Sequence, residues 1–471
     1  MRLWESSPVL KSFSGLGGEK SPPEPHIWEV ETMLKAGFAR VEIAPPLGCM
    51  LTGYYEPRIA KGTLDPLMAS AVAFSDGEKR AVLLVLDLLG IRQRTLDGMR
   101  DRISANLGID RAALFVHCTH THTGPEVCDG MFESDPVYNA RLEMLMEQAC
   151  QMALNDLHEA RLLSADGSVE NISFIRRFRM KDGSTRTNPG YWNPDILEPI
   201  GEKDESLRIV RIVREGADEI LLVNFQVHPD TIGTIMGSVE EFSADYPGFV
   251  VRTLEGALTG VKAVYLNGAC GNLNHVDVHK PEWDQNGGYE HTAHMGRAIA
   301  GEALRIYTKA RPVEDGKLKY AEETLPAPAN KARPEELPRA EQIVKWHDEG
   351  RVDLIPETGM GITTLVAEAT RMLELKDAPD RFMLNMTALS IGELCLAGIP
   401  GEAFTEVGLH IKAHTPFKAQ LVLGISNGYE GYFPTRDAYD EGGYEARSSS
   451  FKAGIAESIA EAETRLIQKL K

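Results

Sequence analysis

The sequence has no long hydrophobic run. Its best apolar stretch, residues 81–89, is interrupted by Asp87, whereas a helix that spans a bilayer needs about 18 or more apolar residues. The first residues also lack the pattern of a secretory signal, in which a charged segment precedes an apolar core. We therefore expect a protein without stable membrane insertion.

Cysteine is sparse and follows no pattern. The chain has six cysteines, and no two of them form a Cys-x-x-Cys pair: Cys49, Cys118, Cys128, Cys150, Cys270 and Cys395. This spacing is not that of a disulfide framework. Reduced thiols in a cytoplasmic protein are the simplest account, so the expected location is cytoplasmic.

Positive charge is also in short supply. Lysine and arginine number 50 against 69 acidic residues, for a net charge of -19, and the basic residues are scattered along the chain. A protein that binds a phosphate backbone needs a basic stripe, so we expect no nucleic acid partner. With 471 residues, 43% of them hydrophobic, the chain is long enough to bury a large core. Nothing in the sequence indicates an oligomeric state.

Predicted strands and helices alternate along the chain. Apolar runs at residues 68–74 and 81–89 flank an Asp76-Gly turn and predict a β-hairpin, as do the runs at 207–213 and 220–225. Apolar residues at helical spacing predict helices that include residues 95–106, 136–157, 246–258, 288–309 and 449–469. This pattern predicts an α/β protein with a mixed β-sheet core covered by helices.

Two segments have the composition of loops. Residues 1–35 are rich in Gly, Pro, Ser and Glu, and we expect them to be a loosely ordered lead-in. Residues 324–338 carry four prolines and predict a loop. Together with helices predicted just after it, this loop forms a helical insertion at about residues 324–378. The chain is therefore expected to fold as a single domain over residues 36–471.

Three histidines stand within six residues at the end of a predicted strand. The apolar run at residues 113–116 predicts a buried strand, and His117, His120 and His122 follow it before a Gly-Pro break. Because a strand alternates its side chains, His120 and His122 are expected to point the same way. Imidazole is the commonest metal ligand in proteins. The motif alone leaves two interpretations open, a metal or catalytic site and a turn whose polar side chains bond the backbone.

Five predicted strands end in short polar segments. Ligands of α/β sheets collect at the carboxyl ends of strands, so these segments are candidates for one shared site. Besides the histidine turn, they contain His228, residues 267–274, Glu402 and Tyr432. Turn formation explains the glycines and prolines of these segments, but not the histidine, glutamate and tyrosine.

The same segments carry a family resemblance. In chain order they read Thr119-His-Thr-His-Thr-Gly-Pro, Val227-His-Pro, Asn267-Gly-Ala-Cys-Gly-Asn-Leu-Asn, Pro400-Gly-Glu-Ala-Phe and Asn427-Gly-Tyr-Glu-Gly-Tyr, with Tyr439 and Tyr444 after the last. Each motif is short, but together and in this order they resemble the neutral/alkaline (non-lysosomal) ceramidase family from about residue 36 to 450. The resemblance implies a ceramidase-like zinc hydrolase catalytic domain.

The resemblance implies a zinc ion held by two histidines, a glutamate and a tyrosine. Carried over to this chain, the ligands would be His120, His228, Glu402 and Tyr432. Nitrogen and oxygen ligands that leave room for water are typical of a catalytic zinc site. Zinc in such a site lowers the pKa of water toward ~7, which supplies hydroxide at neutral pH.

Further residues would handle the substrate. By resemblance, His122 would orient the zinc water or pass its proton to the leaving amine, and Tyr444 would donate a hydrogen bond to the developing oxyanion. Arg176 lies in an altered motif, Ile175-Arg-Arg, where the family has an arginine that contacts substrate. The alternative for Arg176 is a surface arginine in a loop. Tyr439 has no role to inherit, and we expect it to pack in the core.

The chain departs from the family at one catalytic position and in its length. Ceramidases have a serine important for catalysis where this chain has Asn272. An amide is no nucleophile, although it can donate an N–H to an oxyanion. The chain also ends soon after the tyrosine motif, without the additional C-terminal β-domain of ceramidases. The loss of the serine implies a mechanism that rests on zinc-bound hydroxide. The shorter length, together with the expected cytoplasmic location and the lack of an apolar surface segment, argues against ceramide as the substrate.

The expected function is therefore a zinc-dependent hydrolase of a C–N bond, which uses zinc-activated water. Its partner would be a small soluble substrate that contains an amide, lactam or N-acyl bond. Three alternatives stay open: a ceramidase acting on sphingolipid N-acyl bonds, an esterase on the same zinc centre, and a non-catalytic ceramidase-like binding protein.

Overall fold

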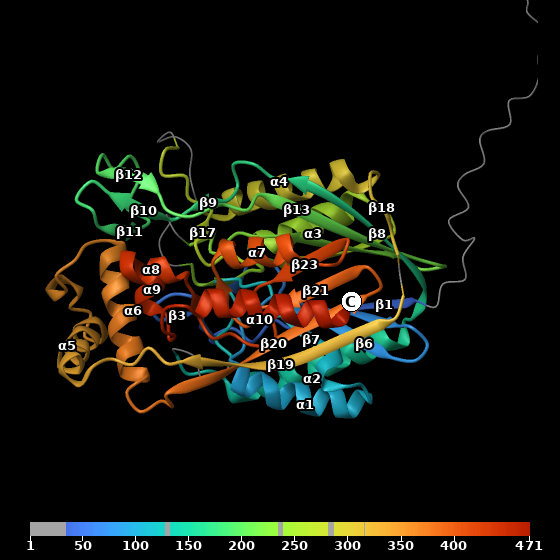
Figure 1. The fold of residues 1–471 in the computed structure, drawn as a ribbon, viewed down its shortest axis with the longest axis horizontal. Helices are drawn as coiled ribbons and strands as arrows, with labels where there is room; N and C mark the ends of the chain where they lie inside the picture. The colour runs from blue at the N-terminus through green and yellow to red at the C-terminus, as the bar shows by residue number, and fades with distance from the viewer. Residues whose placement is uncertain (1–33, 128–131, 234–238, 281–286, 315) are drawn as a thin grey trace, which may run out of the picture. The chain divides into compact units, whose positions relative to one another are not determined.

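Two β-sheets pack face to face in this protein (Figure 1). The structure is a computed structural model that describes residues 34–127, 132–233, 239–280, 287–314 and 316–471, all of which belong to one compact unit. Side chains from both sheets form the apolar core between them, for example Phe74 and Phe115 from the larger sheet and Leu389 and Leu396 from the smaller.

The larger sheet is mixed and has nine strands. Its order is β16 (Val261–Asn267), β14 (Glu219–Phe225), β13 (Ser206–Arg214), β8 (His158–Ser168), β1 (Lys35–Glu42), β5 (Met68–Ser75), β6 (Arg80–Leu86) and β7 (Leu114–Cys118), with β18 (Arg311–Val313) beside β8. The smaller sheet has four strands, β19 (Leu318–Pro328), β20 (Arg381–Ile391), β21 (Leu394–Gly398) and β23 (Ala419–Leu423).

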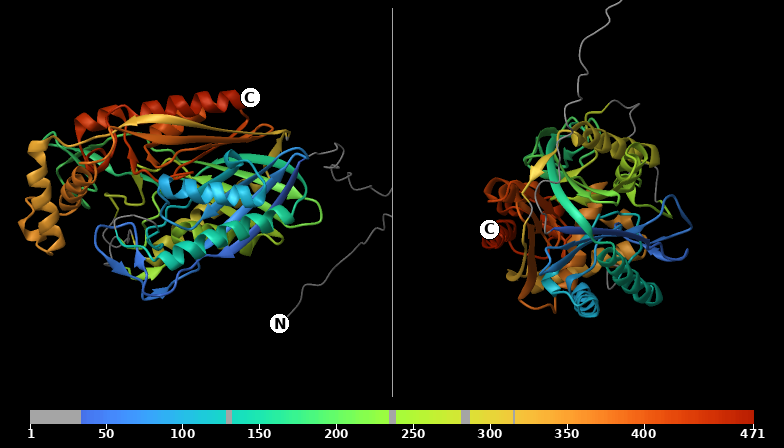
Figure 2. Two further views of the ribbon diagram at one scale, coloured as in Figure 1. Left: turned by 90° about the horizontal axis from the view of Figure 1, so that it is seen from below. Right: turned by 90° about the vertical axis from the view of Figure 1, so that its right-hand side faces the viewer.

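Helices cover the outer face of each sheet. The larger sheet is covered by α1 (Gln93–Leu107), α2 (Pro136–Asn155), α3 (Asp245–Ala257) and α4 (Tyr289–Tyr307). The smaller sheet is covered by α7 (Thr405–His414) and α10 (Ile455–Leu470), and α10 is seen on its outer face in the left view of Figure 2. The predicted α/β class, a mixed sheet covered by helices, is confirmed.

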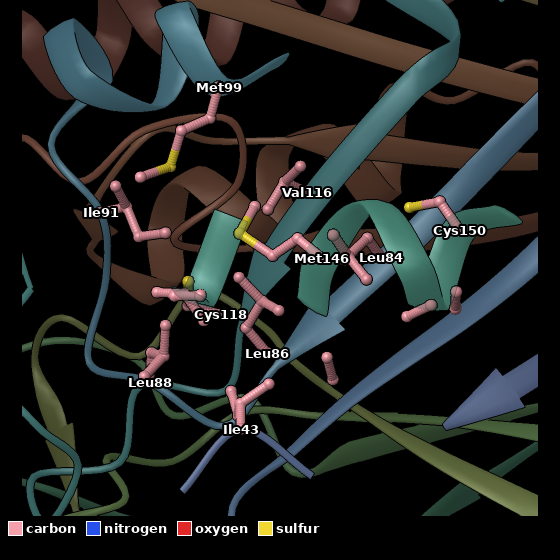
Figure 3. Packing of buried hydrophobic residues seen from close by; sticks show 14 of the residues in the cluster. Ile43, Leu84, Leu86, Leu88, Ile91, Met99, Val116, Cys118, Met146 and Cys150 are labelled. Carbon is pink, nitrogen blue, oxygen red and sulfur yellow. The ribbon is translucent and has the colours of Figure 1, made fainter. Parts of the chain in front are cut away.

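Strand β6 shows how the sequence pattern produces these layers. Leu83 points into the core between the sheets, whereas Leu84 and Leu86 point to the helices. Figure 3 shows these two leucines in one cluster with Met99 of α1 and Met146 of α2. Because both faces of β6 are buried, its sequence is a continuous apolar run rather than an alternating one.

Both predicted hairpins are present. β5 pairs antiparallel with β6, and β13 with β14. In the first turn, Oδ1 of Asp76 accepts the backbone N–H groups of Glu78 and Lys79, and Gly77 has a φ of 85° that only glycine adopts without strain. The turn residues therefore determine where β5 ends.

The segment at residues 324–338, predicted to be a proline-rich loop, is a loop only in part. Residues 324–328 are the end of β19, which pairs with β20 as far as Pro328 opposite Arg381. β19 is the edge strand of its sheet, where a proline nitrogen can face outward without loss of a ladder hydrogen bond. The helices predicted after this segment are α5 (Leu337–Asp348) and α6 (Met360–Glu374), which pack on each other through a small core of their own.

Two other predictions concern the ends of the chain. The last helix, predicted over residues 449–469, begins only at Ile455, because Gly454 with a φ of 99° lies outside helical geometry. Residues 1–33 of the predicted lead-in lie outside the described part of the chain. The helices of the described residues include none that is long and apolar enough to cross a bilayer.

The remaining elements are short, and their strands form small sheets of two or three strands. The strands are β2 (Met50–Leu51), β3 (Arg58–Ile59), β4 (Gly62–Thr63), β9 (Phe174–Ile175), β10 (Arg177–Met180), β11 (Thr185–Thr187), β12 (Ile196–Pro199), β15 (Glu241–Phe242), β17 (Leu273–Asn274), β22 (Glu402–Ala403) and β24 (Tyr432–Phe433). The helices are η1 (Arg111–Ala113), η2 (Pro334–Glu336), η3 (Val352–Leu354), α8 (Arg436–Glu441) and α9 (Tyr444–Ser448).

Candidate metal centre

His120 and His122 lie in a turn rather than on a strand. β7 ends at Cys118, and His120 has a φ of 75°, a left-handed conformation that is uncommon for a residue other than glycine. This turn brings the two imidazole rings edge to face with their centroids 5.0 Å apart. The two histidines do converge, but strand alternation is the wrong explanation because the strand has already ended.

The third histidine of the motif, His117, has a structural role. It lies on β7, where its Nδ1 bonds the carbonyl oxygen of Gly424 at 2.8 Å and its Nε2 accepts the backbone N–H of Asn267 at 3.0 Å. Complete burial lowers its pKa to about 3, so the ring is neutral. His117 thus ties the end of β7 to the end of β16 and to the segment that follows β23.

Three potential ligand atoms converge next to the histidine turn. They are Nε2 of His120, Nε2 of His228 and Oε2 of Glu402. The two nitrogens are 3.2 Å apart, and Oε2 lies 3.3 Å from His120 and 3.1 Å from His228. Ligands bound to zinc at about 2.0–2.1 Å in a tetrahedral site stand roughly 3.3–3.4 Å apart. The spacing of the three atoms therefore fits a single ion between them.

The imidazoles around this point are all oriented by the same kind of contact. In each ring Nδ1 bonds a backbone carbonyl oxygen: His120 to Leu89 at 2.8 Å, His122 to Gly53 at 2.9 Å and His228 to Cys270 at 3.1 Å. A proton on Nδ1 leaves the lone pair of Nε2 free. The three side chains have ligand atoms that all lie within 4.8 Å of one another, as a metal site requires.

Two buried polar atoms at the centre have no hydrogen-bond partner among the described residues. They are Oε2 of Glu402 and Nε2 of His122. A buried polar atom left without a partner costs roughly 1–3 kcal/mol. A cation between these groups would supply the missing partner, so the residues present fit a bound metal ion.

The charges of the centre are consistent with such an ion. Burial alone would raise the pKa of the Glu402 carboxyl, but His120 and His228 hold it well below its usual range. Burial, followed by the charges of the other two imidazoles, lowers the pKa of His122 well below its usual value. The centre thus combines an ionised carboxylate with a neutral His122.

Tyr432 stands beside this group and is held by Arg176. β22 and β24 pair in parallel with Glu402 opposite Tyr432, and the tyrosine ring stacks on His228 at 6.4 Å between centroids. Nη2 of Arg176 donates to the Tyr432 hydroxyl at 3.0 Å, and Nε donates to Glu445 at 2.7 Å. Arg176 is therefore a buried arginine at the centre, and the alternative of a surface arginine is wrong.

A cavity of about 130 Å³ opens onto the centre. Of the residues predicted from the sequence, His122, Glu402, Tyr432 and Tyr444 line it. The other lining residues are Thr52, Gly53, Tyr54, Tyr55, Leu89, Gly90, Arg92, Glu126, Val127 and Tyr429. The hydroxyl of Tyr444 interacts with that of Tyr55, which also packs against the core of α5 and α6.

Asn272, predicted to be a site residue, is not among the residues that line the cavity. Its Oδ1 accepts the backbone N–H of Thr405 at 2.9 Å, and its Nδ2 donates to Glu406 at 3.1 Å. The amide thus caps the start of α7 and does not line the cavity. Tyr439 packs in the core, as predicted, and its hydroxyl bonds the carbonyl oxygen of Phe451 at 2.8 Å.

Three tyrosines at the centre were not predicted from the sequence: Tyr54, Tyr55 and Tyr429. The hydroxyl of Tyr429 donates to Oε1 of Glu402 at 2.9 Å and so orients the carboxylate whose other oxygen faces the two imidazoles. The signal for Tyr429 was its place inside the Asn427-Gly-Tyr-Glu-Gly-Tyr motif. Tyr54 and Tyr55 follow Gly53, and all three residues line the cavity. An aromatic pair directly after a glycine was the signal in the sequence that could have indicated them.

Replacing Tyr429 by phenylalanine is expected to weaken metal binding about 10- to 100-fold, the usual loss when the partner of a metal ligand is removed. The ring stays in place against Gly90, where any side chain would collide with it, so folding is retained. Metal affinity measured by competition with a chromophoric chelator tests this. Tyr439→Phe loses a tyrosine hydroxyl away from the centre and should bind metal as the wild type does.

Among known proteins, only solved structures match this chain. No protein-family model and no curated protein matches the sequence. Among solved structures, the neutral ceramidase from Pseudomonas aeruginosa superposes with a TM-score of 0.71 at 17% identity, over 94% of this chain and 75% of that one. A ceramidase complexed with C2 gives a TM-score of 0.69 at 16% identity, over 93% of this chain and 75% of that one. The protein therefore has the fold of neutral ceramidase.

Proposed function

We propose that the protein is a metal-dependent hydrolase that cleaves an amide-type C–N bond in a small substrate. The convergence of His120, His228 and Glu402 to within 3.3 Å of one another carries the proposal. It is supported by the unbonded atoms of Glu402 and His122, which make the group incomplete without a cation.

The proposed ligands are His120, His228, Glu402 and Tyr432, and the proposed metal is zinc. Nitrogen and oxygen donors on an open cavity suit zinc, and the tautomers of both histidines are set by their carbonyl contacts. When bound, the ion supplies Lewis acidity and an activated water at neutral pH. Arg176 keeps the hydroxyl of Tyr432 in position for this role.

His122 is the proposed general base and acid. Gly53 fixes its Nδ1, which leaves Nε2 to take a proton from the attacking water and then give it to the leaving nitrogen. Its lowered pKa keeps the ring neutral, and its Nε2 has no hydrogen-bond partner among the described residues. Hydrolysis then adds OH to the acyl carbon and H to the amine.

Two residues are proposed to act on the substrate and its surroundings. The hydroxyl of Tyr444 lines the cavity and would donate to the substrate carbonyl oxygen as negative charge develops there. Asn272 would act as the cap of α7 and not on the substrate, because both ends of its amide are already bonded to that helix.

The cavity favours a small polar substrate over a lipid. Its volume of about 130 Å³ is close to that of a cavity of roughly 150 Å³ that holds one benzene molecule. Among the described residues that line it, Leu89 and Val127 are the only large apolar ones apart from the tyrosines. Hydrolysis of the N-acyl bond of a sphingolipid is the second candidate, and the ceramidase fold favours it.

Release of amine from a panel of short N-acyl amines and small lactams tests the proposal. We expect hydrolysis of at least one compound, a loss of more than about 100-fold in rate after treatment with a zinc chelator, and recovery with added zinc. A short-chain ceramide and a set of chromogenic esters in the same assay separate the ceramidase and esterase alternatives.

A protein that keeps its full rate after the metal is removed would contradict the proposal. A protein that binds zinc but cleaves none of the amides, esters or ceramides would instead support the non-catalytic binding protein. Thermal unfolding of the chelated protein provides the control, because the loss of rate must occur in protein that is still folded.

A further inference from the structure

A half-buried arginine, Arg92, lines the cavity beside the metal centre. Arg92 lies between β6 and α1, three residues after Leu89, whose carbonyl holds His120. The described residues include none that forms an ion pair or hydrogen bond with its side chain. A guanidinium offers five N–H donors and stays charged at any physiological pH. With no such partner among the described residues, the guanidinium of Arg92 is available to a ligand in the cavity.

The neighbouring acidic groups are engaged elsewhere. Glu430 accepts the backbone N–H of Gln93 at 2.9 Å, and Glu126 accepts the hydroxyl of Thr52 at 3.1 Å. The positive charge of Arg92 still acts on both carboxyls and on the Tyr429 hydroxyl, where it opposes the rise in pKa that burial causes. The guanidinium is thus close enough to these groups to influence their charge, yet it forms a salt bridge with neither carboxylate.

The wall of the cavity also carries a negative group. Glu126 is 7% exposed, and burial raises its pKa to about 6. This carboxylate would repel a doubly charged anion such as a phosphate more strongly than a singly charged one, and Arg92 is the one arginine among the described residues that line the cavity. A singly charged, planar carboxylate matches the fork of one arginine.

We propose that Arg92 binds a carboxylate of the substrate, so that the class of substrate is a small amide that carries a free carboxylate, as an N-acyl amino acid does. This inference rests on the proposed amide hydrolase function. Arg92 would then determine specificity. It would bind the carboxylate of the substrate, while the amide bond to be cleaved lies near His122. The small volume of the cavity, about 130 Å³, requires both ends to lie close together, as they do in an N-acyl amino acid.

Two ligands that differ only in this charge test the inference: N-acetyl-L-alanine and N-acetyl-L-alanine amide. Their binding to the metal-loaded protein is measured by isothermal titration calorimetry, and their hydrolysis by release of amine. We expect the carboxylate to bind the wild type more tightly than the amide. Arg92→Gln should weaken the carboxylate about 10- to 100-fold and leave the amide unchanged. Arg92→Lys should restore part of the difference, because it keeps the charge but not the fork.

Arg102→Gln is the matched control. Arg102 is an exposed arginine on α1 that pairs with Glu143, away from the cavity, so its loss should change neither ligand. Equal binding of the two ligands to the wild type would overturn the inference, and so would equal weakening of both by Arg92→Gln or binding of neither ligand at millimolar concentration.

The binding data separate this inference from the proposed function. If the carboxylate binds through Arg92 but neither compound is cleaved, the inference stands and the amidase proposal loses support. If amides are cleaved but Arg92→Gln changes the binding of N-acetyl-L-alanine and of its amide equally, the hydrolase proposal stands and the inference fails.

Discussion

Exchanging Glu402 for glutamine is expected to remove most of the metal from the protein. Oε2 of Glu402 lies 3.3 Å from Nε2 of His120 and 3.1 Å from Nε2 of His228. If the amide nitrogen of the new side chain takes this place, it donates to an imidazole and occupies a lone pair that the ion needs. If the amide oxygen takes it, the ligand has lost its charge.

We expect metal content to fall from about one ion per chain to below a tenth, with a loss of more than about 100-fold in kcat/KM, since a ligand contributes at least as much as the group that supports it. Elemental mass spectrometry of the purified protein measures the first quantity and amide hydrolysis the second. Both readouts must fall together if the ion is required for the reaction.

Glu170→Gln serves as the control for this exchange. Glu170 is an exposed glutamate outside the centre, so the same change of charge there should leave metal content and rate as they are. A Glu402→Gln protein that retains a full complement of metal would show that the ion is held by another set of ligands, such as the three histidines 120, 122 and 228.

The sequence predicted the elements well because each depends on local pattern. The hairpin of β5 and β6 follows from two apolar runs around Asp76, and α2 from apolar residues at helical spacing. The candidate centre could be predicted for a similar reason. Its side chains lie just after strands, and parallel pairing of β14 with β16 and of β21 with β23 brings the ends of these strands together.

What the sequence did not reveal depends on contacts between distant segments. The division into two sheets could not be predicted, because the sequence around β18 and β19 does not indicate which strand each pairs with. In the structure β18 pairs with β8 of the larger sheet, and β19 joins the smaller sheet. Arg92 precedes a helix and has no motif around it. Its place in the cavity arises only because the segment before α1 packs against Tyr429, where Gly90 leaves room for the ring.

A second exchange tests the stability of the fold away from the centre. Glu463 lies on α10 and is completely buried against the smaller sheet near Cys395. Neither of its carboxyl oxygens makes a hydrogen bond of normal geometry with the described residues, although the backbone of Gly398 lies close by. Burial raises the pKa of this carboxyl well above its usual value, so the folded protein keeps the group protonated.

This raised pKa makes the protein less stable as the pH rises. Above a pH of about 4.5 the unfolded chain releases the proton of Glu463 while the folded chain keeps it, so the free energy of unfolding falls with pH until the pKa of the folded state is reached. Glutamine resembles the protonated carboxyl and does not titrate. Glu463→Gln should therefore raise the free energy of unfolding by about 1–3 kcal/mol at pH 8 and by much less at pH 4.5.

Denaturant unfolding at both pH values measures the effect, with Glu461→Gln as the control. Glu461 is an exposed residue of the same helix that pairs with Arg465, and exposed pairs of this kind contribute only about 0.3–0.5 kcal/mol. Its loss should lower stability slightly at both pH values. A Glu463→Gln protein that is less stable than the wild type at pH 8 would mean that the carboxylate is ionised in the folded state and that a group between α10 and the smaller sheet stabilises its charge. The sign of the change at pH 8 thus decides whether this helix is held against the sheet by apolar packing alone or also by a buried charge.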